Sequence, residues 1–397
     1  MTGETNSPTG RLAVLALNDW YLPGYRGGGP VTSLRNLVGQ LAHAVDFRIV
    51  TRDRDLGETS PYAGVRRGTW QPVEGSQVLY VRPAAWRIHD LLGVLRGTRH
   101  DVLYLNSFFS PRFTLTALLL RRLGWVPRRP TVLAVRGEFS PGALALKAGK
   151  KALYLRLARR AGLLRGVLFQ ATTEEERAYI RRVLGEATPV QVAPCLSAPS
   201  AAGEARTERE GGALRLVFLS RISPMKNLDF ALDVLRDVQE PVELSIYGPV
   251  EDEAYWARCQ AKLQALPAHI RVGYHGSVEP PQVVGTLRGH DALFLPTRGE
   301  NFGHVIVEAL SAGCAVLISD RTPWKDLEAA GCGWALPLED PGAFARRIDE
   351  LARLGREEWR GLSGQAVTYA ARVTRDAAAV EQSLQMFRNA ERSVHGA

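Results

Sequence analysis

The sequence predicts an α/β protein built from two doubly wound, Rossmann-like parallel-sheet domains. Two series of short β-branched runs alternate with helical patterns, and a polar stretch of small residues separates the two series. Such alternation is typical of parallel sheets covered by helices. At 397 residues, 45% hydrophobic and 23% charged, the chain is long enough for two separate cores. We therefore expect the active site in a cleft between the two domains.

The first series of runs predicts a domain over residues 1–196. Its expected strands cover residues 11–18, 46–51, 77–82, 101–106, 131–136 and 166–172. The pattern stops at Pro194, and residues 197–213 are small, polar and rich in Ala, Gly and Glu. That composition is typical of a linker.

The second series predicts another domain, over residues 214–372. Its expected strands cover residues 214–220, 242–248, 271–276, 291–297 and 314–319. In open α/β sheets, ligands bind beyond the carboxyl ends of the strands. The loops after Ser220, Gly248, Gly276 and Thr297 are therefore expected to face one crevice, and Gly248 is counted among the binding residues.

Composition narrows the classes of partner. Lys and Arg number 50 against 41 Asp and Glu, a formal charge of +9, which favours an anionic partner such as a phosphate, a membrane surface or a nucleic acid. Aromatic residues are not interleaved with the basic runs, which argues against nucleic acid. The N-terminus is polar and no run reaches the roughly 18 apolar residues of a membrane-spanning helix, so a cytoplasmic protein is expected.

The cysteines point to packing rather than to a metal or disulfide framework. They have no C-x-x-C pair and no neighbouring histidines, so we expect them reduced and mostly buried. These residues are Cys195, Cys259, Cys314 and Cys332.

A turn after the strand over 291–297 leads into a helix that we expect to begin near Gly303. The backbone N–H groups of Asn301, Phe302 and Gly303 would have no partner within that helix, so they can bind phosphate oxygens with help from the helix dipole. Gly303 also allows a ligand to approach the backbone closely. The sequence therefore predicts an anion site here.

Two carboxylates flank this turn. Glu300 precedes it and Glu308 follows eight residues later, so the two can lie up to about 12 Å apart if the segment is helical. Ionised carboxylates accept hydrogen bonds from hydroxyl groups, which suits a sugar at one end of a diphosphate and a ribose at the other. The alternative is that both are ordinary turn and helix residues.

A pair of cations follows the first strand of the second domain. Arg221 and Lys226 lie in one strand-to-helix loop braced by Pro224. When a bond to a nucleoside diphosphate breaks, preorganised Arg and Lys stabilise the growing negative charge without a metal. Two solvated surface cations are the alternative.

The second half of the chain resembles the nucleotide-sugar domain of retaining family-four glycosyltransferases, which have the GT-B fold. The resemblance includes E-x7-E at Glu300 and Glu308 and the Arg-x4-Lys pair at Arg221 and Lys226. It implies that Glu300 contacts the donor sugar, Glu308 the ribose, and the two cations the diphosphate. It also implies retention of anomeric configuration, no metal or other cofactor, and a C-terminal helical segment, 373–397, that returns to the first domain.

The first domain offers weaker candidates. Gly28 and Gly29 lie in a loop that faces donor and acceptor in similar enzymes. Many relatives carry a histidine after the strand over 131–136, where this chain has Arg136 and Glu138. Glu138 is a candidate base and Arg136 a candidate acceptor or phosphate contact, with surface salt bridging as the alternative.

Three other features are open to competing interpretations. Asp53 and Asp55 form a D-x-D pair that binds a metal in the other large glycosyltransferase fold, although they lie far from the expected nucleotide site. His304 is expected to pack rather than to catalyse. The basic run over 147–166 predicts either peripheral contact with an anionic membrane or an ordinary amphipathic helix.

The sequence thus predicts a retaining hexosyl- or related sugar transferase. It would move sugar from a nucleoside diphosphate donor to a hydroxyl of a cell-surface polysaccharide or lipid-linked glycan, in the cytoplasm or at the inner face of the plasma membrane. The alternatives are a nucleotide-sugar 2-epimerase of the same fold, for which no additional acid and base groups can be identified, and a non-catalytic nucleotide-sugar-binding protein.

Overall fold

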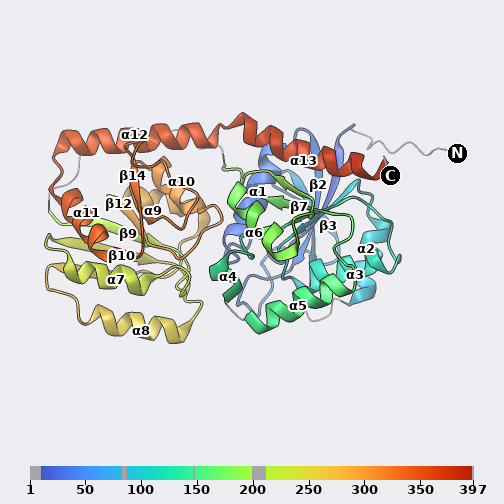
Figure 1. Cartoon of the computed structure of the whole chain (residues 1–397), viewed down its shortest axis with the longest axis horizontal. Helices are drawn as coiled ribbons and strands as arrows, with labels where there is room; N and C mark the ends of the chain where they lie inside the picture. Colours follow the sequence, from blue (N-terminus) through green and yellow to red (C-terminus); the bar gives the residue numbers. More distant parts are fainter. Residues whose placement is uncertain (1–9, 83–86, 146–147, 199–211, 396–397) are drawn as a thin grey trace. The chain divides into compact units, whose positions relative to one another are not determined.

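The computed structural model describes residues 10–82, 87–145, 148–198 and 212–395, and the chain divides into two compact units. Unit 1 comprises Met1–Ala198 and Asp376–Ala397, and unit 2 comprises Pro199–Arg375. Most of the stretch predicted as a linker lies outside the described residues. Figure 1 shows each unit as a sheet with helices on its faces.

Unit 1 contains an eight-stranded sheet in the order β3-β4-β2-β1-β5-β6-β7-β8. Every neighbouring pair is parallel except β3 and β4, which form an antiparallel hairpin. The strands are β1 (Leu12–Leu17), β2 (Val45–Arg52), β3 (Trp70–Val73), β4 (Ser76–Val81), β5 (Val102–Asn106), β6 (Thr131–Ala134), β7 (Val167–Ala171) and β8 (Val190–Val192).

The helices of unit 1 cover both faces of this sheet, and two separate apolar clusters fill the two interfaces. The helices are α1 (Gly29–Leu41), α2 (Ile88–Gly97), the π-helical turn η1 (Pro111–Leu115), α3 (Thr116–Arg122), α4 (Pro141–Ala145), α5 (Ala148–Arg160), α6 (Glu174–Leu184) and α13 (Ala377–His395).

Helix α13 follows unit 2 in sequence but packs into the core of unit 1. The ring of Phe387 meets Phe47 and Tyr104 edge to face, with centroids 6.1 and 5.4 Å apart. Met386 and Phe387 are completely buried in the same cluster as residues of β1, β2 and β5. The last helix is therefore an integral layer of unit 1.

Unit 2 contains a six-stranded, fully parallel sheet in the order β11-β10-β9-β12-β13-β14. Numbered within the unit, this is the 3-2-1-4-5-6 order of a doubly wound Rossmann sheet. The strands are β9 (Leu214–Leu219), β10 (Val242–Tyr247), β11 (Ile270–Tyr274), β12 (Ala292–Leu295), β13 (Ala315–Ser319) and β14 (Gly333–Leu336).

One continuous apolar core holds unit 2 together, and its strands β12 and β13 are completely buried. The predicted fold class is confirmed in both units. The helical elements here are α7 (Leu228–Asp237), α8 (Glu253–Leu263), the 3-10 turn η2 (Pro280–Gln282), α9 (Val283–Arg288), α10 (His304–Ser311), α11 (Pro341–Arg353) and α12 (Arg356–Thr374).

The starts of the helices differ in a way that bears on ligand binding. The side chains of Thr173 and Asp252 cap α6 and α8 by accepting backbone N–H bonds at 3.1 and 2.9 Å. By contrast, α1, α7 and α10 begin after Gly28, Asn227 and Gly303, all with positive φ and without a side-chain cap. The first amides of these three helices therefore donate no hydrogen bond to the side chain of their own cap residue.

Two further expectations can be compared with the described residues. All four cysteines are free and buried, as predicted. No helix in the described ranges is both long enough and apolar enough to cross a bilayer.

Candidate functional site

The candidate site lies at the point in the unit 2 sheet where the strand order reverses. Strands β9 and β12 are neighbours, but the chain leaves them toward opposite edges of the sheet. Loops diverge at such a switch point, and ligands of open α/β sheets bind there. The loop after β9 carries Arg221 and Lys226, and the loop after β12 carries Glu300.

Lys226 and Glu300 form an ion pair across this switch point. Their side chains are only 12% and 13% exposed, so the pair is largely withdrawn from solvent. Charges in such a setting interact more strongly than at a free surface. The structure thus brings together two of the predicted site residues from loops more than 70 positions apart in sequence.

Asn227 fixes the relative position of the two loops. It is buried with a left-handed backbone, φ 64°, and its side-chain amide donates to the Pro296 carbonyl at 2.9 Å. Its side-chain oxygen accepts from Nε of Arg298, also at 2.9 Å. The carbonyl of Met225 accepts from the Thr297 hydroxyl at 3.0 Å. These bonds join the residues on either side of Lys226 to the stretch just before Glu300, and the sequence analysis did not identify Asn227.

Arg221 has a different partner from Lys226. Its Nη1 donates to Oε1 of Glu251 at 2.8 Å, and Glu251 lies in the loop after the neighbouring strand β10. Gly248 makes this arrangement possible because a Cβ on it would lie 1.9 Å from the Ser220 carbonyl oxygen. Glu251 was not predicted, although it is the first acidic residue after a loop that was expected to face the site.

The start of α10 agrees with the expectation of a helix near Gly303. Gly303 has φ 81° and precedes the helix, with Asn301 and Phe302 in the turn before it. The ring of His304 lies beside Phe302 with centroids 4.8 Å apart, as expected for a packing residue. Glu308 is half-buried on the second turn of the same helix. All these residues lie at the carboxyl-end side of β12.

In unit 1, Asp55 organises the glycine-containing loop. Its carboxylate accepts the backbone N–H groups of Tyr25 and Arg26 at 2.8 and 3.1 Å. Further along this loop, Gly28 has φ 67° and is the last residue before α1, and Gly29 is the first residue of that helix. The Asp55 carboxylate therefore fixes this loop at the carboxyl end of β1.

Asp53 has different partners. Its buried carboxylate pairs with Arg54 at 2.9 Å and with Arg67 at 2.5 Å. Neither Asp53 nor Asp55 joins a cluster of three potential metal ligands anywhere in the described residues. Both carboxylates serve loop structure, which does not favour the D-x-D metal interpretation.

Arg136 points into unit 1 rather than toward a surface partner. It has φ 57°, and its guanidinium donates to Asn106 Oδ1 at 2.6 Å, to the Tyr104 hydroxyl at 2.7 Å and to Cys195 Sγ at 3.4 Å. Burial raises the pKa of the Tyr104 hydroxyl to about 12, so it remains protonated beside this cation. The surface salt bridge considered for Arg136 does not form.

Glu138 holds the loop after β5. Its carboxylate accepts from the Ser107 hydroxyl at 2.6 Å and from the backbone N–H groups of Phe108 and Phe109 at 2.6 and 3.2 Å. Burial raises the pKa of this carboxyl above its ordinary value. The Glu138 carboxylate therefore accepts three hydrogen bonds from the loop after β5. These partners are a hydroxyl and two backbone amides, not the cation of a surface salt bridge.

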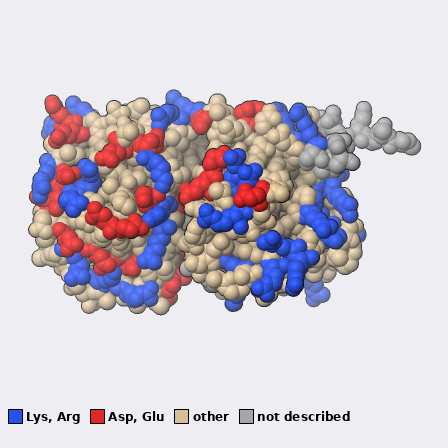
Figure 2. Space-filling model, viewed as in Figure 1, with Lys and Arg blue, Asp and Glu red and all other residues tan. Residues whose placement is uncertain are grey.

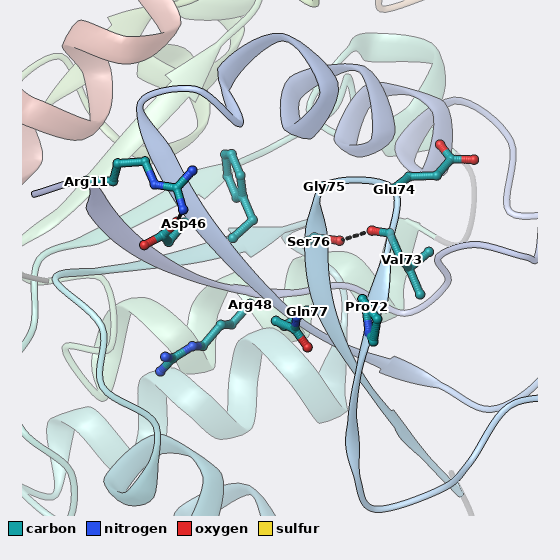
Figure 3. A pocket seen from close by; sticks show the side chains of 10 residues that line it. Arg11, Asp46, Arg48, Pro72, Val73, Glu74, Gly75, Ser76 and Gln77 are labelled. Atoms are coloured by element: carbon teal, nitrogen blue, oxygen red, sulfur yellow. Dashed lines mark hydrogen bonds and ion pairs between the residues drawn. The ribbon is translucent and has the colours of Figure 1, made fainter. Parts of the chain in front are cut away.

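A depression of about 450 Å³ lies elsewhere in unit 1, around the β3–β4 turn (Figure 3). Arg11 reaches toward Asp46 on one side, and the Ser76 hydroxyl donates to the Val73 carbonyl at 2.8 Å on the other. Asp46 and Ser76 stand at the amino ends of β2 and β4, whereas ligands of such sheets bind at the carboxyl ends. None of the predicted site residues lines this depression.

Comparison with known families gives the same division of the chain. Residues 204–360 match the family described as "Glycosyl transferases group 1", and residues 28–195 match "Glycosyl transferase 4-like domain". The chain belongs to the family-four type of glycosyltransferases. Both family models describe transferases, so a family-four epimerase is not favoured.

Solved structures of other proteins share the GT-B fold with this chain. Sucrose-phosphate synthase from Thermosynechococcus elongatus aligns with a TM-score of 0.71 at 15% identity, covering 96% of this chain and 99% of that one. Anabaena HepE in complex with UDP and glucose also gives 0.71 at 15% identity, covering 96% and 100%. At this identity the likeness establishes the fold alone.

Sequence relatives match shorter stretches. A phosphatidyl-myo-inositol mannosyltransferase of Mycobacterium leprae is 31% identical over 186 residues, 45% of this chain and 47% of that protein. A D-inositol 3-phosphate glycosyltransferase of Rhodococcus jostii is 25% identical over 363 residues, 81% and 76% of the two chains. This family-four chain thus spans less than half the length of the first of these relatives.

Proposed function

We propose that this chain transfers a sugar from a nucleoside diphosphate donor to a hydroxyl acceptor. The observation that carries the proposal is the Lys226–Glu300 ion pair at the switch point of unit 2, with Arg221 on the same loop as Lys226. A doubly wound sheet places its ligand at this point, and a leaving diphosphate needs cations. We assign donor binding to the domain expected over residues 214–372, which lies within unit 2, and the acceptor side to unit 1.

The ion pairs suggest how the donor is received. Before binding, each cation has a carboxylate partner, Glu300 for Lys226 and Glu251 for Arg221. A diphosphate arriving between them competes for both cations through charge-assisted hydrogen bonds. Glu300 is then released to accept hydroxyl hydrogen bonds from the donor sugar, and the cations stabilise the leaving diphosphate as the glycosidic bond breaks.

The remaining roles follow from position. The amides at Asn301, Phe302 and Gly303 add hydrogen-bond donors for phosphate at the uncapped start of α10. Glu308, on the same helix, is assigned to the ribose. With cations available for the leaving group, we propose that the reaction needs no metal.

Reaction outcome and specificity are further parts of the proposal. Retention of anomeric configuration and a hexosyl donor rest on the family resemblance. Relatives named for phosphatidyl-myo-inositol and D-inositol 3-phosphate suggest an inositol-containing or lipid-linked acceptor, and a neighbour solved with UDP and glucose suggests a UDP-sugar donor. We place the reaction at the inner face of the plasma membrane, with contact through the basic run 147–166.

A two-stage experiment tests the proposed activity. UDP, GDP, ADP and their sugars are first screened by thermal shift, because a ligand that binds the native state raises the melting temperature. The best donor is then incubated with inositol-type and glycan acceptors in the presence of EDTA, and the product linkage is read by NMR. We expect acceptor-dependent transfer with retention.

The alternative functions give different results in the same assay. Conversion of the donor in the absence of acceptor to its 2-epimer would indicate an epimerase. Tight donor binding without turnover across the acceptor panel would indicate a binding protein. Loss of activity in EDTA that Mg²⁺ restores would contradict the metal-independent mechanism.

A further inference from the structure

The outer surface of unit 1 carries an unusual concentration of exposed apolar side chains. The described residues include eight large apolar side chains that are clearly exposed, and five of them lie between residues 119 and 157. Their exposures run from 38% to 57%. They are Leu119, Leu123, Trp125, Leu153 and Leu157. Exposed apolar groups gathered in one region mark a site of interaction.

Two helices contribute these side chains at helical spacing. Leu153 and Leu157 are four residues apart on α5, and Leu119 and Leu123 are four residues apart at the end of α3. Residues at this spacing lie on one face of a helix. Each pair therefore forms an apolar ridge on its own helix.

The two ridges belong to neighbouring parts of the fold. Arg121 of α3 donates from Nη1 to the Arg165 carbonyl at 2.7 Å and from Nη2 to the Gly166 carbonyl at 2.9 Å. Both carbonyls lie in the turn that follows α5. We call the outer faces of α3 and α5, with Trp125, the α3/α5 surface.

The charge of this region is almost entirely positive. Between Val102 and Thr173 the sequence holds thirteen Lys and Arg residues and a single acidic residue, Glu138. Glu138 is engaged with the loop after β5 and does not neutralise the surface. Figure 2 shows Lys and Arg gathered over the area where Figure 1 places α3 and α5, with little Asp or Glu there.

Few side chains of helix α5 pack against the rest of unit 1. Of its thirteen residues only Ala158 is fully buried, and Tyr154 and Leu155 pack against the core. Exposed Arg156, Arg159 and Arg160 accompany the exposed leucines. Lys147, also in the basic run, lies outside the described residues. A helix with apolar side chains and guanidinium groups together on its exposed surface suits the interface of an anionic bilayer.

A hollow beside the end of α5 fits the same partner. It has a volume of about 250 Å³ and is bordered by Arg159, Arg165 and Thr188. Two guanidinium groups and a hydroxyl are suitable donors for a phosphate head group. Leu164 and Phe169 also line the hollow, so it offers apolar contact beside its two guanidinium groups.

We propose that the α3/α5 surface docks on the surface of an anionic lipid bilayer. The leucines and Trp125 insert at the level of the head groups, and the arginines pair with lipid phosphates. This deepens the membrane part of the proposed function, because it names the second helix, the tryptophan and the apolar ridges that act together with the basic run. Nucleic acid fits less well, since five exposed apolar side chains gain nothing from contact with a polyanion.

The inner face of α5 connects this surface to the loops of unit 1. The Tyr154 hydroxyl donates to the Phe108 carbonyl at 2.9 Å, and Nζ of Lys151 lies 5.1 Å from the centre of the Phe109 ring. Phe108 and Phe109 belong to the loop that Glu138 holds at the carboxyl end of β5. Docking through α5 therefore brings the carboxyl-end loops of unit 1 close to the bilayer, where a lipid-linked acceptor would be.

Vesicle binding by the full chain tests this proposal. Phosphatidylcholine vesicles with and without about 30% phosphatidylglycerol are sedimented with wild type, with the double variant Leu153→Ser/Leu157→Ser and with Arg156→Glu/Arg160→Glu. We expect binding to the anionic vesicles that weakens with salt, and at least a tenfold loss in each double variant. Val284→Ser and Arg360→Glu, exposed positions of unit 2, are the matched controls and should bind like wild type.

A second measurement follows one side chain. Vesicles with brominated acyl chains should quench tryptophan fluorescence in wild type, and most of that quenching should disappear in Trp125→Phe. Circular dichroism confirms that each variant is folded, and donor turnover with a soluble acceptor should be unchanged in all of them. If the transferase proposal is wrong, the wild-type chain will show no donor turnover, but it will still bind anionic vesicles.

Three results would overturn the proposal. The first is a wild-type chain that ignores anionic vesicles at low salt. The second is undiminished binding by the leucine variant. The third is equal competition by double-stranded RNA that depends on the arginines and not on the leucines, which would make this surface a polyanion site.

Discussion

The switch points of the two sheets use charged residues in different ways. In unit 2, Lys226 and Arg221 pair with Glu300 and Glu251, side chain to side chain. In unit 1, the carboxylates of Asp55 and Glu138 accept mainly backbone N–H groups of neighbouring loops. Side-chain ion pairs can exchange partners when an anion arrives, whereas removing a carboxylate from backbone amides leaves those donors without their acceptor and destabilises the loop. The same sheet architecture thus carries the proposed binding site in one unit and a loop frame held by backbone hydrogen bonds in the other.

The strongest test of this comparison removes the cations of unit 2. We expect Lys226→Ala and Arg221→Ala to lower kcat/KM for the donor by about 100-fold or more, because each loses a group that stabilises the leaving diphosphate. Steady-state kinetics and a thermal melt measure the two effects separately. The matched control is Arg271→Ala, which breaks the ion pair with Glu243 on the strands and should leave donor kinetics unchanged.

Wild-type kinetics in Arg221→Ala or in Glu308→Ala would contradict the assignment of the donor site. Glu251→Gln provides a finer comparison, because it weakens the competitor for Arg221 without removing the cation. This variant should keep donor use at or above the wild-type level.

The next largest effect is expected in unit 1. Glu138→Ala leaves the Phe108 and Phe109 amides without their acceptor, so we expect a loss of about 2 kcal/mol in the stability of unit 1. Hydrogen exchange at these two amides measures the loss directly. Glu175→Ala, which removes an exposed carboxylate bound to the Tyr179 hydroxyl, is the control and should change little.

The affinity of Glu138→Ala for the nucleoside diphosphate should stay within about twofold of wild type, since unit 2 is untouched. Suppose that this variant lost donor affinity but kept wild-type hydrogen exchange at these amides. That result would contradict the assignment of donor binding to unit 2 and of the loop frame to unit 1.

A smaller effect is expected from the residue that joins the two loops of unit 2. Asn227→Gly keeps the left-handed backbone but loses the bonds to Pro296 and Arg298, and we expect kcat to fall about tenfold as Lys226 and Glu300 lose their fixed positions. Asn227→Ala should be worse, because alanine also resists the left-handed conformation. A purely structural role would lower the melting temperature of Asn227→Gly while leaving kcat and KM at wild-type values.

The smallest predicted effect is a pH dependence of unit 1. Burial raises the pKa of Glu138, so the folded state holds this proton at a pH where the unfolded chain has lost it. Stability is therefore expected to decline as pH rises from the ordinary Glu value of about 4.3 through the raised pKa, and to level off above it. Unfolding measured from pH 4 to 7 should show this decline in wild type and not in Glu138→Gln. If the stability of wild type and of Glu138→Gln declined in the same way with pH, Glu138 would not be the group that causes the decline.

The central strands could be predicted from the sequence, whereas three of the four edge strands in the described sheets could not. Strands such as β12 and β13 are buried on both faces, so they are continuous apolar runs that sequence reasoning finds. The strands it missed, β3, β8 and β14, are three or four residues long and lie at the edges of their sheets. Edge strands are only half covered, so their sequences lack such runs.

Within the site, positions were predictable and partners were not. Loops after parallel strands meet at one edge, which placed Lys226 and Glu300 near each other. The choice of Glu251 as partner for Arg221 depends on the close contact between Gly248 and Ser220, which no sequence pattern encodes. Arg136 points inward from a left-handed backbone, a conformation that is rare for arginine and therefore not expected from sequence.

The place of α13 in the core of unit 1 has a consequence for biosynthesis. Until residues 377–395 have been made, the apolar rings of Phe47 and Tyr104 lack the layer that covers them. The strands and helices of unit 2 are all encoded before that point. The core of unit 1 can therefore be completed only after unit 2 has been synthesised, and one apolar face of the half made first stays uncovered until then.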